Sequence, residues 1–253
     1  MIRAMIPSVR QQSIIDTLEK DGKLHFIADL ARELDTSEST LRRDLKVLAQ
    51  TGKISMLRGG GVCLKQNHTE LDIDSKLYIH VEEKRIIAQY AVSLVEPGDV
   101  IFLDPSSICY FMISDELARL PVTVVTNSCM NMTQLLKMNI HCIMIGGETK
   151  KSTNACIGSM AEEIMSRLSF TKCFLGANGL TEEAGITNHD TNERSIKRLA
   201  IERSKQAYFL INSNKVGVTT LCQVAEISRW PIIMDHVPDD LKKYPNIIDA
   251  SLQ

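Results

Sequence analysis

The segment that decides the fold of the amino-terminal part of the chain is SESTLRRDLKVLAQ, residues 37–50. Its leucines, Leu41, Leu45 and Leu48, stand at i, i+4 and i+7, which is the spacing of one buried stripe on a helix. Ser37, or Thr36 before it, is of a residue type that caps helix amino termini. The spacing therefore predicts a capped amphipathic helix that buries a narrow stripe of leucines.

The opposite face of this helix is polar and cationic. At about 100° per residue, Ser39, Arg42, Arg43 and Lys46 point away from the leucine stripe. The forked guanidinium of arginine bonds guanine edges or phosphates with two N–H groups, and a hydroxyl near the helix start, such as that of Thr40, can meet a base edge or a phosphate oxygen. The alternative is a solvated helix face, which is what most charge clusters are.

The flanking residues favour DNA contact over a solvated face. Apolar residues at helical spacing predict two earlier helices, from Pro7 to Asp21 and from Phe26 to Leu34. After the capped helix, apolar residues alternate at 54–56 and 62–64, and a glycine turn stands between these two strands. Three helices and a glycine-tipped hairpin are the pattern of a winged helix-turn-helix, whose tip brings amides and cations to the phosphates beside the major-groove helix.

The order of these motifs resembles the DNA-binding domain of the DeoR family of bacterial transcriptional regulators. The resemblance rests on the string from Thr40 to Leu45 and on the Arg-Gly-Gly tip, and it runs without a gap from about residue 10 to residue 62. We predict a winged helix-turn-helix domain over residues 7–64 that binds double-stranded operator DNA. The predicted DNA contacts are Ser37, Ser39, Thr40, Arg42, Arg43, Lys46, Arg58, Gly59 and Gly60.

The size and composition of the chain bound its class. Its 253 residues exceed one typical domain of about 100–200 residues and predict a second, larger domain. With 44% hydrophobic and 24% charged residues, a mostly disordered, collagenous or disulfide-scaffold protein is excluded. No run approaches the ~18 apolar residues of a membrane helix, and the segment MIRAMIPSVRQQ lacks the apolar stretch of a secretory signal. We expect a cytoplasmic protein with no membrane partner.

Charge and cysteine usage agree with this class. Residues 1–66 carry eleven Lys and Arg against eight Asp and Glu, whereas residues 67–253 carry eighteen against twenty-three, so the basic part is the amino-terminal one. The seven cysteines are widely spaced and mostly set in apolar strings. We expect reduced core residues, and neither a disulfide framework nor a zinc site. We predict no metal and no cofactor.

A larger α/β domain is predicted after a linker. Residues 65–76 are polar and without periodicity, so we place the linker there and the second domain over residues 77–240. In that domain short apolar runs alternate with helical patterns, which predicts a mostly parallel sheet covered by helices. The expected strands are 100–103, 122–125, 142–145, 173–175, 208–211 and 232–234.

Small and polar residues follow these strands. Gly, Ser and Asn are the usual turn formers, but loops and helix amino termini also meet at the carboxyl ends of parallel strands, where open α/β sheets bind ligands. The groups there suit a sugar phosphate, with Lys215 neutralising the phosphate, and Asp104, Asn127 and Asn178 bonding hydroxyls. The predicted ligand residues are Asp104, Ser106, Ser107, Thr126, Asn127, Ser128, Gly146, Gly147, Asn178, Gly179, Glu193, Lys197 and Lys215.

The order of elements from Glu82 to Asp235 resembles the effector domain of the DeoR family. The strings that carry the resemblance are Glu83–Ala88, Val125–Ser128, Gly146-Gly147 and Phe174–Gly176. The resemblance implies a sensor domain related in fold to ribose-5-phosphate isomerase, a phosphorylated sugar or related metabolite as effector, and a repressor of a carbohydrate operon.

The chain departs from the family pattern at three places. It has Asp104-Pro105-Ser106-Ser107-Ile108 where the family has Asp-Ser-Gly-Thr-Thr, Ala177-Asn178-Gly179 for Ala-Asp-Gly, and Asn212-Ser213-Asn214-Lys215 for Asp-Ser-Ser-Lys. Two carboxylates are thereby replaced by amides. This makes the rim of the sheet, where the carboxyl ends of its strands meet, less negative and favours binding of an anion there. Pro105 stiffens the first loop and removes one backbone donor.

Two other functions fit parts of the chain. A sugar-phosphate isomerase with an appended DNA-binding domain would use Glu193 or His189 to move a proton between sugar carbons, whereas Glu193 and Lys197 can also be an i,i+4 surface pair. A Rossmann-type oxidoreductase is disfavoured because no strand is followed by G-x-G-x-x-G. We predict ligand contact without catalysis and no catalytic residue. We also predict a homodimer or homotetramer, because two-fold oligomers match inverted-repeat operators.

Overall fold

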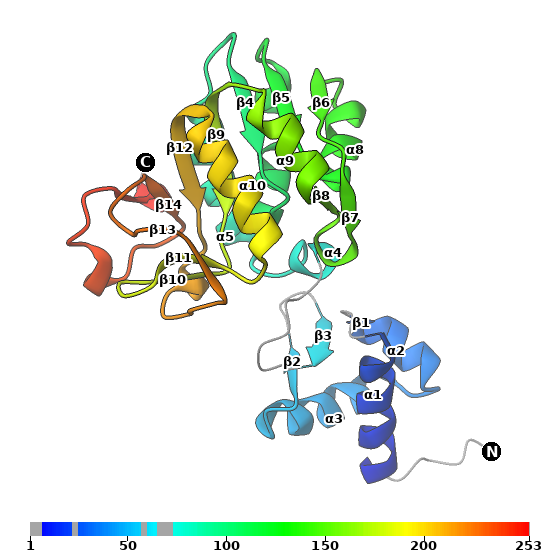
Figure 1. The fold of residues 1–253 in the computed structure, drawn as a ribbon. Coiled ribbons are helices and arrows are strands. Elements are labelled where there is room, and N and C mark those ends of the chain that lie inside the picture. The colour runs from blue at the N-terminus through cyan, green and yellow to red at the C-terminus, as the bar shows by residue number, and fades with distance from the viewer. Residues whose placement is uncertain (1–6, 22–24, 57–59, 65–72, 253) are drawn as a thin grey trace. The chain divides into compact units, whose positions relative to one another are not determined.

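The computed structural model describes residues 7–21, 25–56, 60–64 and 73–252, and the chain falls into two compact units that divide between His80 and Val81 (Figure 1). The first unit holds short helices and a small sheet, and the second holds a large sheet with helices on both faces. The predicted fold class is confirmed. No helix in the described ranges is both long and apolar enough to cross a membrane.

The amino-terminal unit has the predicted order of three helices and a hairpin. Its elements are α1 (Pro7–Asp21), β1 (His25–Phe26), α2 (Ile27–Glu33), α3 (Glu38–Gln50), β2 (Ile54–Met56), β3 (Gly61–Leu64) and α4 (Ile73–Lys76). The three helices meet around fully buried side chains, among them Leu18, Leu30, Leu41 and Leu45. The leucine stripe of the capped helix therefore faces the core, as its spacing predicts.

The small sheet of this unit has one more strand than the predicted hairpin. β1 pairs antiparallel with β3, which also pairs with β2, so the strand order is β1-β3-β2. Phe26 lies in β1, where it is opposite Gly61, and not in the second helix as predicted. A two-residue strand is too short to leave a periodic signal, which is why the sequence pattern missed it.

The predicted linker is partly helical. Residues 65–72 lie outside the described residues, but residues 73–76 form α4, in which Ile73 and Ser75 are buried. Tyr78 then packs edge-on against Phe26, with ring centroids 5.4 Å apart. The apolar contacts of this short segment give it order, although its four helical residues are too few for a periodic pattern.

The second unit is built on a seven-stranded sheet with the order β15-β14-β12-β9-β4-β5-β6, and each neighbouring pair is parallel. The six predicted strands are all present, and two of them are longer than predicted. The strands are β4 (Val100–Leu103), β5 (Thr123–Thr126), β6 (Cys142–Met144), β9 (Phe170–Gly176), β12 (Ser204–Leu210), β14 (Ile232–Met234) and β15 (Ile247–Asp249). β15 lies beyond residue 240 and was not predicted, because only Ile247 and Ile248 of its three residues are apolar.

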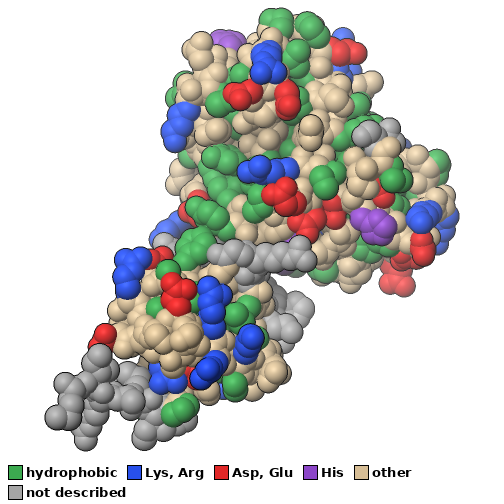
Figure 2. Space-filling view, turned by 180° about the vertical axis from the view of Figure 1, so that it is seen from behind, with side chains coloured by type: hydrophobic (Ala, Val, Ile, Leu, Met, Phe, Trp, Pro, Cys, Tyr) green, Lys and Arg blue, Asp and Glu red, His purple; other side chains and the backbone are tan. Residues whose placement is uncertain are grey.

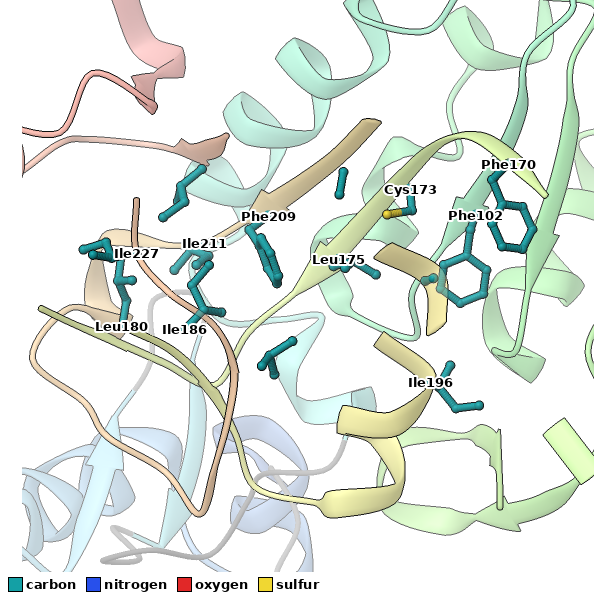
Figure 3. Close-up of a cluster of buried hydrophobic side chains, with 14 of the residues drawn as sticks. Phe102, Phe170, Cys173, Leu175, Leu180, Ile186, Ile196, Phe209, Ile211 and Ile227 are labelled. Atoms are coloured by element: carbon teal, nitrogen blue, oxygen red, sulfur yellow. The ribbon is translucent and has the colours of Figure 1, made fainter. Parts of the chain in front are cut away.

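Both faces of the sheet are buried, as an all-parallel sheet requires. Along β4, Phe102 points into a core that includes Ile196 of α10 (Thr191–Glu202) and Phe209 (Figure 3). Ile101 and Leu103 point the other way, into a core that includes α5 (Val81–Ser93). The alternation along the strand thus builds one hydrophobic layer on each face.

The remaining elements were not individually predicted. The helices are α6 (Ser107–Met112), α7 (Asp115–Ala118), α8 (Cys129–Lys137) and α9 (Ser159–Ser166). A hairpin is formed by β7 (Glu148–Lys150), η1 (Lys151–Thr153) and β8 (Ala155–Ile157), and a second small sheet by β10 (Gly179–Thr181), β11 (Gly185–Asn188) and β13 (Cys222–Ala225). Short 3-10 turns are η2 (Ser213–Lys215), η3 (Asp239–Leu241) and η4 (Ala250–Leu252).

Candidate functional site

The exposed face of α3 is the first candidate site. Ser37 caps the helix, because its Oγ accepts a hydrogen bond from the Thr40 backbone N–H at 3.2 Å. Thr40 is half-buried, and the other predicted contact residues of the helix are exposed, namely Ser39, Arg42, Arg43 and Lys46. Lys and Arg side chains are spread over the visible face of this unit in the space-filling view (Figure 2).

The cations on α3 differ in whether other side chains of the protein pair with them. Arg42 reaches Glu38 at 3.4 Å, an exposed i,i+4 pair of little energetic weight. Arg43 and Lys46 have no ion-pair or hydrogen-bond partner among the described residues. The guanidinium of Arg43 and the ammonium of Lys46 are therefore available to an external anion.

Asp44 supports the exposed face of α3 from below, and the sequence reasoning missed it. Its carboxylate is buried and accepts hydrogen bonds from Arg10 Nε at 2.5 Å and from Gln11 Nε2 at 3.2 Å, both on α1. The pair fixes the roll of α3 against α1, which in turn sets the direction of the cationic face. Its position three residues after Leu41, on the leucine side of the helix, is the signal that would have found it.

The wing is described only in part. Gly60 has a positive φ of +83°, and its carbonyl accepts a hydrogen bond from the Ile27 N–H at 2.9 Å. This bond ties the start of β3 to the start of α2. The other two predicted wing residues, Arg58 and Gly59, lie outside the described residues.

The second candidate site lies at the carboxyl ends of β4, β5 and β9, where a network of buried polar groups gathers. Asp104 follows β4 and is 2% exposed. Lys197 of α10 donates to Asp104 Oδ2 at 2.5 Å and to the Gly176 carbonyl at 2.9 Å, and the Gly176 N–H donates to the same carboxylate at 3.0 Å. Burial raises the pKa of Asp104 and the nearby Glu193 carboxylate adds to the rise, while Lys197 opposes it only in part.

The loop after β5 extends this network. Thr126 Oγ1 donates to the Leu103 carbonyl at 2.7 Å, and Asn131 Nδ2 donates to the Asp104 carbonyl at 3.0 Å. Ser128 caps α8 by accepting from the Asn131 N–H at 3.1 Å. The structure therefore brings the predicted residues Asp104, Thr126 and Ser128 together with Lys197, and Asn131 joins them without having been predicted.

Several buried polar atoms of the second unit have no hydrogen-bond partner in the part of the chain that the structure describes. They are Asn127 Oδ1, Asn131 Oδ1, Asn212 Nδ2 and Thr220 Oγ1. A buried polar atom without a partner costs about 1–3 kcal/mol, so each of these atoms calls for a partner such as an ordered water or a bound ligand. Asn127 and Asn131 both belong to the rim segment at and after the end of β5.

Glu193 belongs to the same region but makes different bonds. Its Oε1 accepts from Lys150 Nζ at 2.9 Å and from Thr153 Oγ1 at 2.8 Å, and its Oε2 accepts from Asn188 Nδ2 at 2.9 Å. Both Glu193 and Lys197 are buried. The alternative of an exposed i,i+4 pair between them is therefore wrong, because each side chain points into the domain and bonds a different partner.

The other predicted ligand residues differ in how they relate to this network. Ser106 caps α6 and Ser107 is the buried first residue of that helix. Asn178 Oδ1 accepts from the His189 N–H at 3.3 Å, and Lys215 is half-buried in η2. No contact shown by the structure joins Gly146, Asn178 or Lys215 to Asp104.

Two of the predicted glycines have packing roles. At Gly179 a Cβ atom would lie 2.2 Å from the Val218 carbonyl oxygen, and at Gly147 it would lie 2.7 Å from the Ile157 carbonyl oxygen. Close backbone approach requires glycine at both positions, whether or not a ligand lies near. At Gly146, by contrast, a Cβ atom would have no neighbour within 4 Å among the described residues, so packing there does not require glycine.

Comparison with known proteins identifies the family. The description "DeoR-like helix-turn-helix domain" matches residues 10–67, and "DeoR C terminal sensor domain" matches residues 79–236. The chain belongs to the DeoR family of transcriptional regulators. The family resemblance predicted from the Thr40–Leu45 string and the glycine tip is thereby confirmed.

Curated relatives support the assignment to the DeoR family over nearly the whole chain. The HTH-type transcriptional regulator FruR of Bacillus subtilis is 35% identical over 90% of this chain and 91% of its own length. The L-fucose operon activator of Haemophilus influenzae is 33% identical over 93% and 95%. The lactose phosphotransferase system repressor of Staphylococcus epidermidis is 30% identical over 94% and 95%. These are names of transcriptional regulators, which bears out the prediction of a transcriptional regulator.

Solved structures give a more distant likeness for this DeoR-family chain. Ribose-5-phosphate isomerase A of Methanocaldococcus jannaschii aligns with a TM-score of 0.39 at 17% identity, over 53% of each chain. The translation initiation factor eIF-2B of Pyrococcus horikoshii aligns with a TM-score of 0.44 at 14% identity, over 87% of this chain and 70% of that one. At this distance neither likeness extends to activity.

Proposed function

We propose that this DeoR-family regulator is a repressor of a carbohydrate operon, that α3 binds operator DNA, and that a phosphorylated sugar bound in the second unit changes the affinity for the operator. The observation that carries the proposal is the exposed cationic face of α3, held in one orientation by the buried Arg10–Asp44 pair. Rigid placement matters, because direct readout in the major groove depends on a few side chains that reach base edges in a fixed register.

The DNA contacts divide by chemistry. Arg43 and Lys46, which no described residue engages, are the cations that phosphates or guanine edges would attract most directly. Ser39 and Thr40 lie at the amino-terminal end of α3, where backbone N–H groups also face an incoming phosphate. Arg42 would exchange its exposed contact with Glu38 for a DNA contact at little cost.

The unpartnered buried atoms support a polyhydroxylated effector. Asn127 Oδ1 and Asn131 Oδ1 are acceptors without donors, which suits sugar hydroxyls. Asn212 Nδ2 is a donor without an acceptor, which suits a hydroxyl or phosphate oxygen, and it stands three residues before Lys215. This amide replaces the aspartate of the family pattern, and a neutral donor suits an anion better than a carboxylate does.

The relatives support the carbohydrate class of the regulated operon. The two whose names state an operon or transport system concern L-fucose and lactose. One is named an activator and the other a repressor, so the sign of regulation in this chain needs its own experiment. We also propose a homodimer or homotetramer, because two-fold symmetry matches inverted-repeat operators. Light scattering of the purified chain, with and without operator DNA, measures the oligomer.

A thermal-shift screen tests the effector proposal. Full-length protein is melted with pentose phosphates, hexose phosphates, the corresponding free sugars, and inorganic phosphate. A ligand at 100 times its dissociation constant adds about 2.7 kcal/mol to the stability of the domain that binds it. We expect stabilisation by at least one sugar phosphate, and little by the free sugar or inorganic phosphate alone.

Two substitutions test whether the stabilising sugar phosphate binds at Lys215. Lys215→Ala should leave DNA binding intact and remove the stabilisation, whereas Lys137→Ala, at an exposed position on α8, should change neither. If no sugar phosphate stabilises the protein, or if Lys215→Ala responds as the wild type does, the effector chemistry or the place of Lys215 in it is wrong.

A further inference from the structure

Cys129 and Cys156 are neighbours at the sensor rim, although 27 residues separate them in the sequence. All seven cysteines are reduced, and Cys129 is exposed, contrary to the expectation of buried core thiols. Cys129 is the first residue of α8, directly after the cap Ser128. Cys156 is the central residue of β8 and is 5% exposed.

Backbone pairing fixes the two cysteines with respect to each other. Ser128 and Ala155 form an antiparallel bridge. The Cys129 N–H donates to the Asn154 carbonyl at 2.9 Å, and the Cys156 N–H donates to the Asn127 carbonyl at 2.7 Å. Asn127 Nδ2 also donates to the Cys156 carbonyl at 2.8 Å. The loop after β5 and the hairpin strand β8 are therefore joined by three hydrogen bonds on either side of this bridge.

This backbone pairing places the Cys129 thiol close to that of Cys156. Burial raises the pKa of Cys156, and the adjacent Cys129 thiol, within hydrogen-bond range, raises it further. Disulfide formation needs the two sulfur atoms to approach to about 2 Å with a suitable dihedral angle. Two thiols on neighbouring backbone segments that are held together by hydrogen bonds require only a local adjustment to reach that distance.

We propose that Cys129 and Cys156 are a peroxide-sensitive thiol pair that forms an intramolecular disulfide. In the first step the exposed Cys129 thiolate attacks hydrogen peroxide, which gives a Cys129 sulfenic acid and hydroxide, and the hydroxide takes up the proton of the thiol to become water. In the second step the Cys156 sulfur displaces the sulfenic hydroxyl, the S–S bond forms, and the hydroxyl leaves with the Cys156 proton as a second water. Two thiols are oxidised and one peroxide is reduced to two waters. Intracellular disulfides of this kind are usually transient and act as redox sensors.

The position of the pair connects it to the sensor network. The hairpin that carries Cys156 also carries Lys150 and Thr153, whose side chains bond Glu193. The loop that leads to Cys129 carries Thr126, Asn127 and Ser128. A disulfide would lock this hairpin to the loop, so it should slow entry and exit of the effector. This consequence rests on the proposed function, whereas formation of the disulfide does not.

Peptide mapping of the oxidised full-length chain tests the proposal. The protein is treated with hydrogen peroxide, blocked with an alkylating agent, digested without reductant, and analysed by mass spectrometry. We expect the intact chain to lose two hydrogen atoms and a linked Cys129–Cys156 peptide to appear, both reversed by dithiothreitol. In Cys129→Ser and Cys156→Ala the linked peptide should be lost, and in Cys142→Ser it should persist.

The cysteine variants test the two oxidation steps separately. In Cys156→Ala a sulfenic acid should accumulate on Cys129 and be trapped by dimedone, because its resolving thiol is missing. Oxidation of wild-type Cys129 to sulfinic or sulfonic acid without the link would overturn the proposal, as would a Cys129–Cys129 link between two chains. If the link forms but dissociation of the effector found in the thermal-shift screen is unchanged, the thiol pair stands and its coupling to the sensor site is wrong. If that screen finds no effector, the linked peptide still decides the disulfide proposal by itself.

Discussion

The face of α3 and the rim of the sensor sheet both carry charged side chains, but those on α3 are exposed and those at the rim are buried and paired. On α3, Arg43 and Lys46 are exposed and have no partner among the described residues. At the rim, Asp104 and Lys197 are at most 4% exposed, and each is bonded to the other. The first surface presents charge to whatever approaches, whereas the second keeps its charge desolvated and paired.

The difference matches two kinds of partner. DNA is a large, rigid polyanion, so solvated cations suffice to attract it, and counterion release supplies much of the affinity. A small metabolite makes few contacts, and each must be strong and directional, which a buried and preorganised site provides. The two regions should therefore respond differently to substitution: loss of a rim charge should affect folding, and loss of an α3 cation should affect only binding.

The largest effect is expected at the rim. Lys197→Met should destabilise the second unit by about 3–5 kcal/mol, because it leaves the Asp104 carboxylate buried without its cation. The pKa of Asp104 is already raised, so the folded variant can take up a proton there. A folded-state pKa above the unfolded value gives stability that is present at low pH and lost as pH rises. The deficit should therefore shrink toward acid pH.

Chemical denaturation followed by hydrogen exchange of peptides from residues 81–252 measures this deficit. Lys137→Met on the exposed side of α8 is the matched control and should cost less than about 0.5 kcal/mol. If Lys197→Met were as stable as the control at neutral pH, the rim would not be a desolvated charge network.

The next effect is expected inside the amino-terminal unit, where one buried charge pair supports the exposed face. Asp44→Ala should destabilise this unit by about 3 kcal/mol, because Arg10 loses its buried partner. DNA binding should fall with it, and the second unit should keep its stability. Hydrogen exchange resolved by unit is the measurement. Asp29→Ala, which removes an exposed carboxylate paired with Arg32, is the control and should change stability by at most about 1 kcal/mol.

Arg43→Ala should leave both units folded and weaken DNA binding. The expected loss is about 1–3 kcal/mol of operator affinity if Arg43 contacts a base, with a smaller loss on random DNA. Fluorescence anisotropy on the two DNAs measures both losses. Arg167→Ala removes the same charge from an exposed site in the second unit and should have little effect. Equal losses on the two DNAs would reassign Arg43 to a phosphate, and no loss would remove it from the interface.

The smallest effects are expected at Ser37 and Ser39, and comparing them distinguishes helix capping from DNA contact. Ser37→Ala should cost about 1 kcal/mol of stability, because the Thr40 N–H loses its acceptor. Ser39→Ala should leave stability nearly unchanged and lower only the DNA affinity. Thermal melts and anisotropy on both variants give the comparison. A stability loss at Ser39 as large as that at Ser37 would mean that the two serines share the capping role.

Sequence patterns predicted those parts of the molecule that repeat with a fixed period. The leucine spacing of α3 and the apolar runs of β4 and β14 each gave the correct element, because helices and buried strands must place apolar residues regularly. The strand β1 was not predicted because two residues carry no period, and β15 was not predicted because only two of its three residues are apolar. The pairing of Lys197 with Asp104 was not predicted for a different reason. The two residues are 93 positions apart in the sequence, and only the fold of the domain brings them together.

Residue type alone predicted that Asp104, Thr126, Ser128 and Lys197 lie near one another, but it did not predict how each of them is bonded. Thr126 and Ser128 were predicted as ligand groups, and the structure shows both engaged in internal hydrogen bonds. Asn131 was not predicted, because it lies in the first turn of α8 and not in a loop. Its unpartnered Oδ1 becomes apparent only when burial and hydrogen bonds are known.

The most direct test of DNA binding through α3 is selection of genomic fragments by the full-length chain. Sheared DNA from the source organism is incubated with wild-type protein and with a triple variant, Arg42→Ala, Arg43→Ala and Lys46→Ala, over a range of salt concentrations. The wild type should enrich discrete fragments with an affinity that falls steeply as salt rises, and the variant should enrich none while both its units stay folded. Equal enrichment by the two proteins, or none by the wild type at any salt concentration and with any sugar phosphate present, would contradict the account.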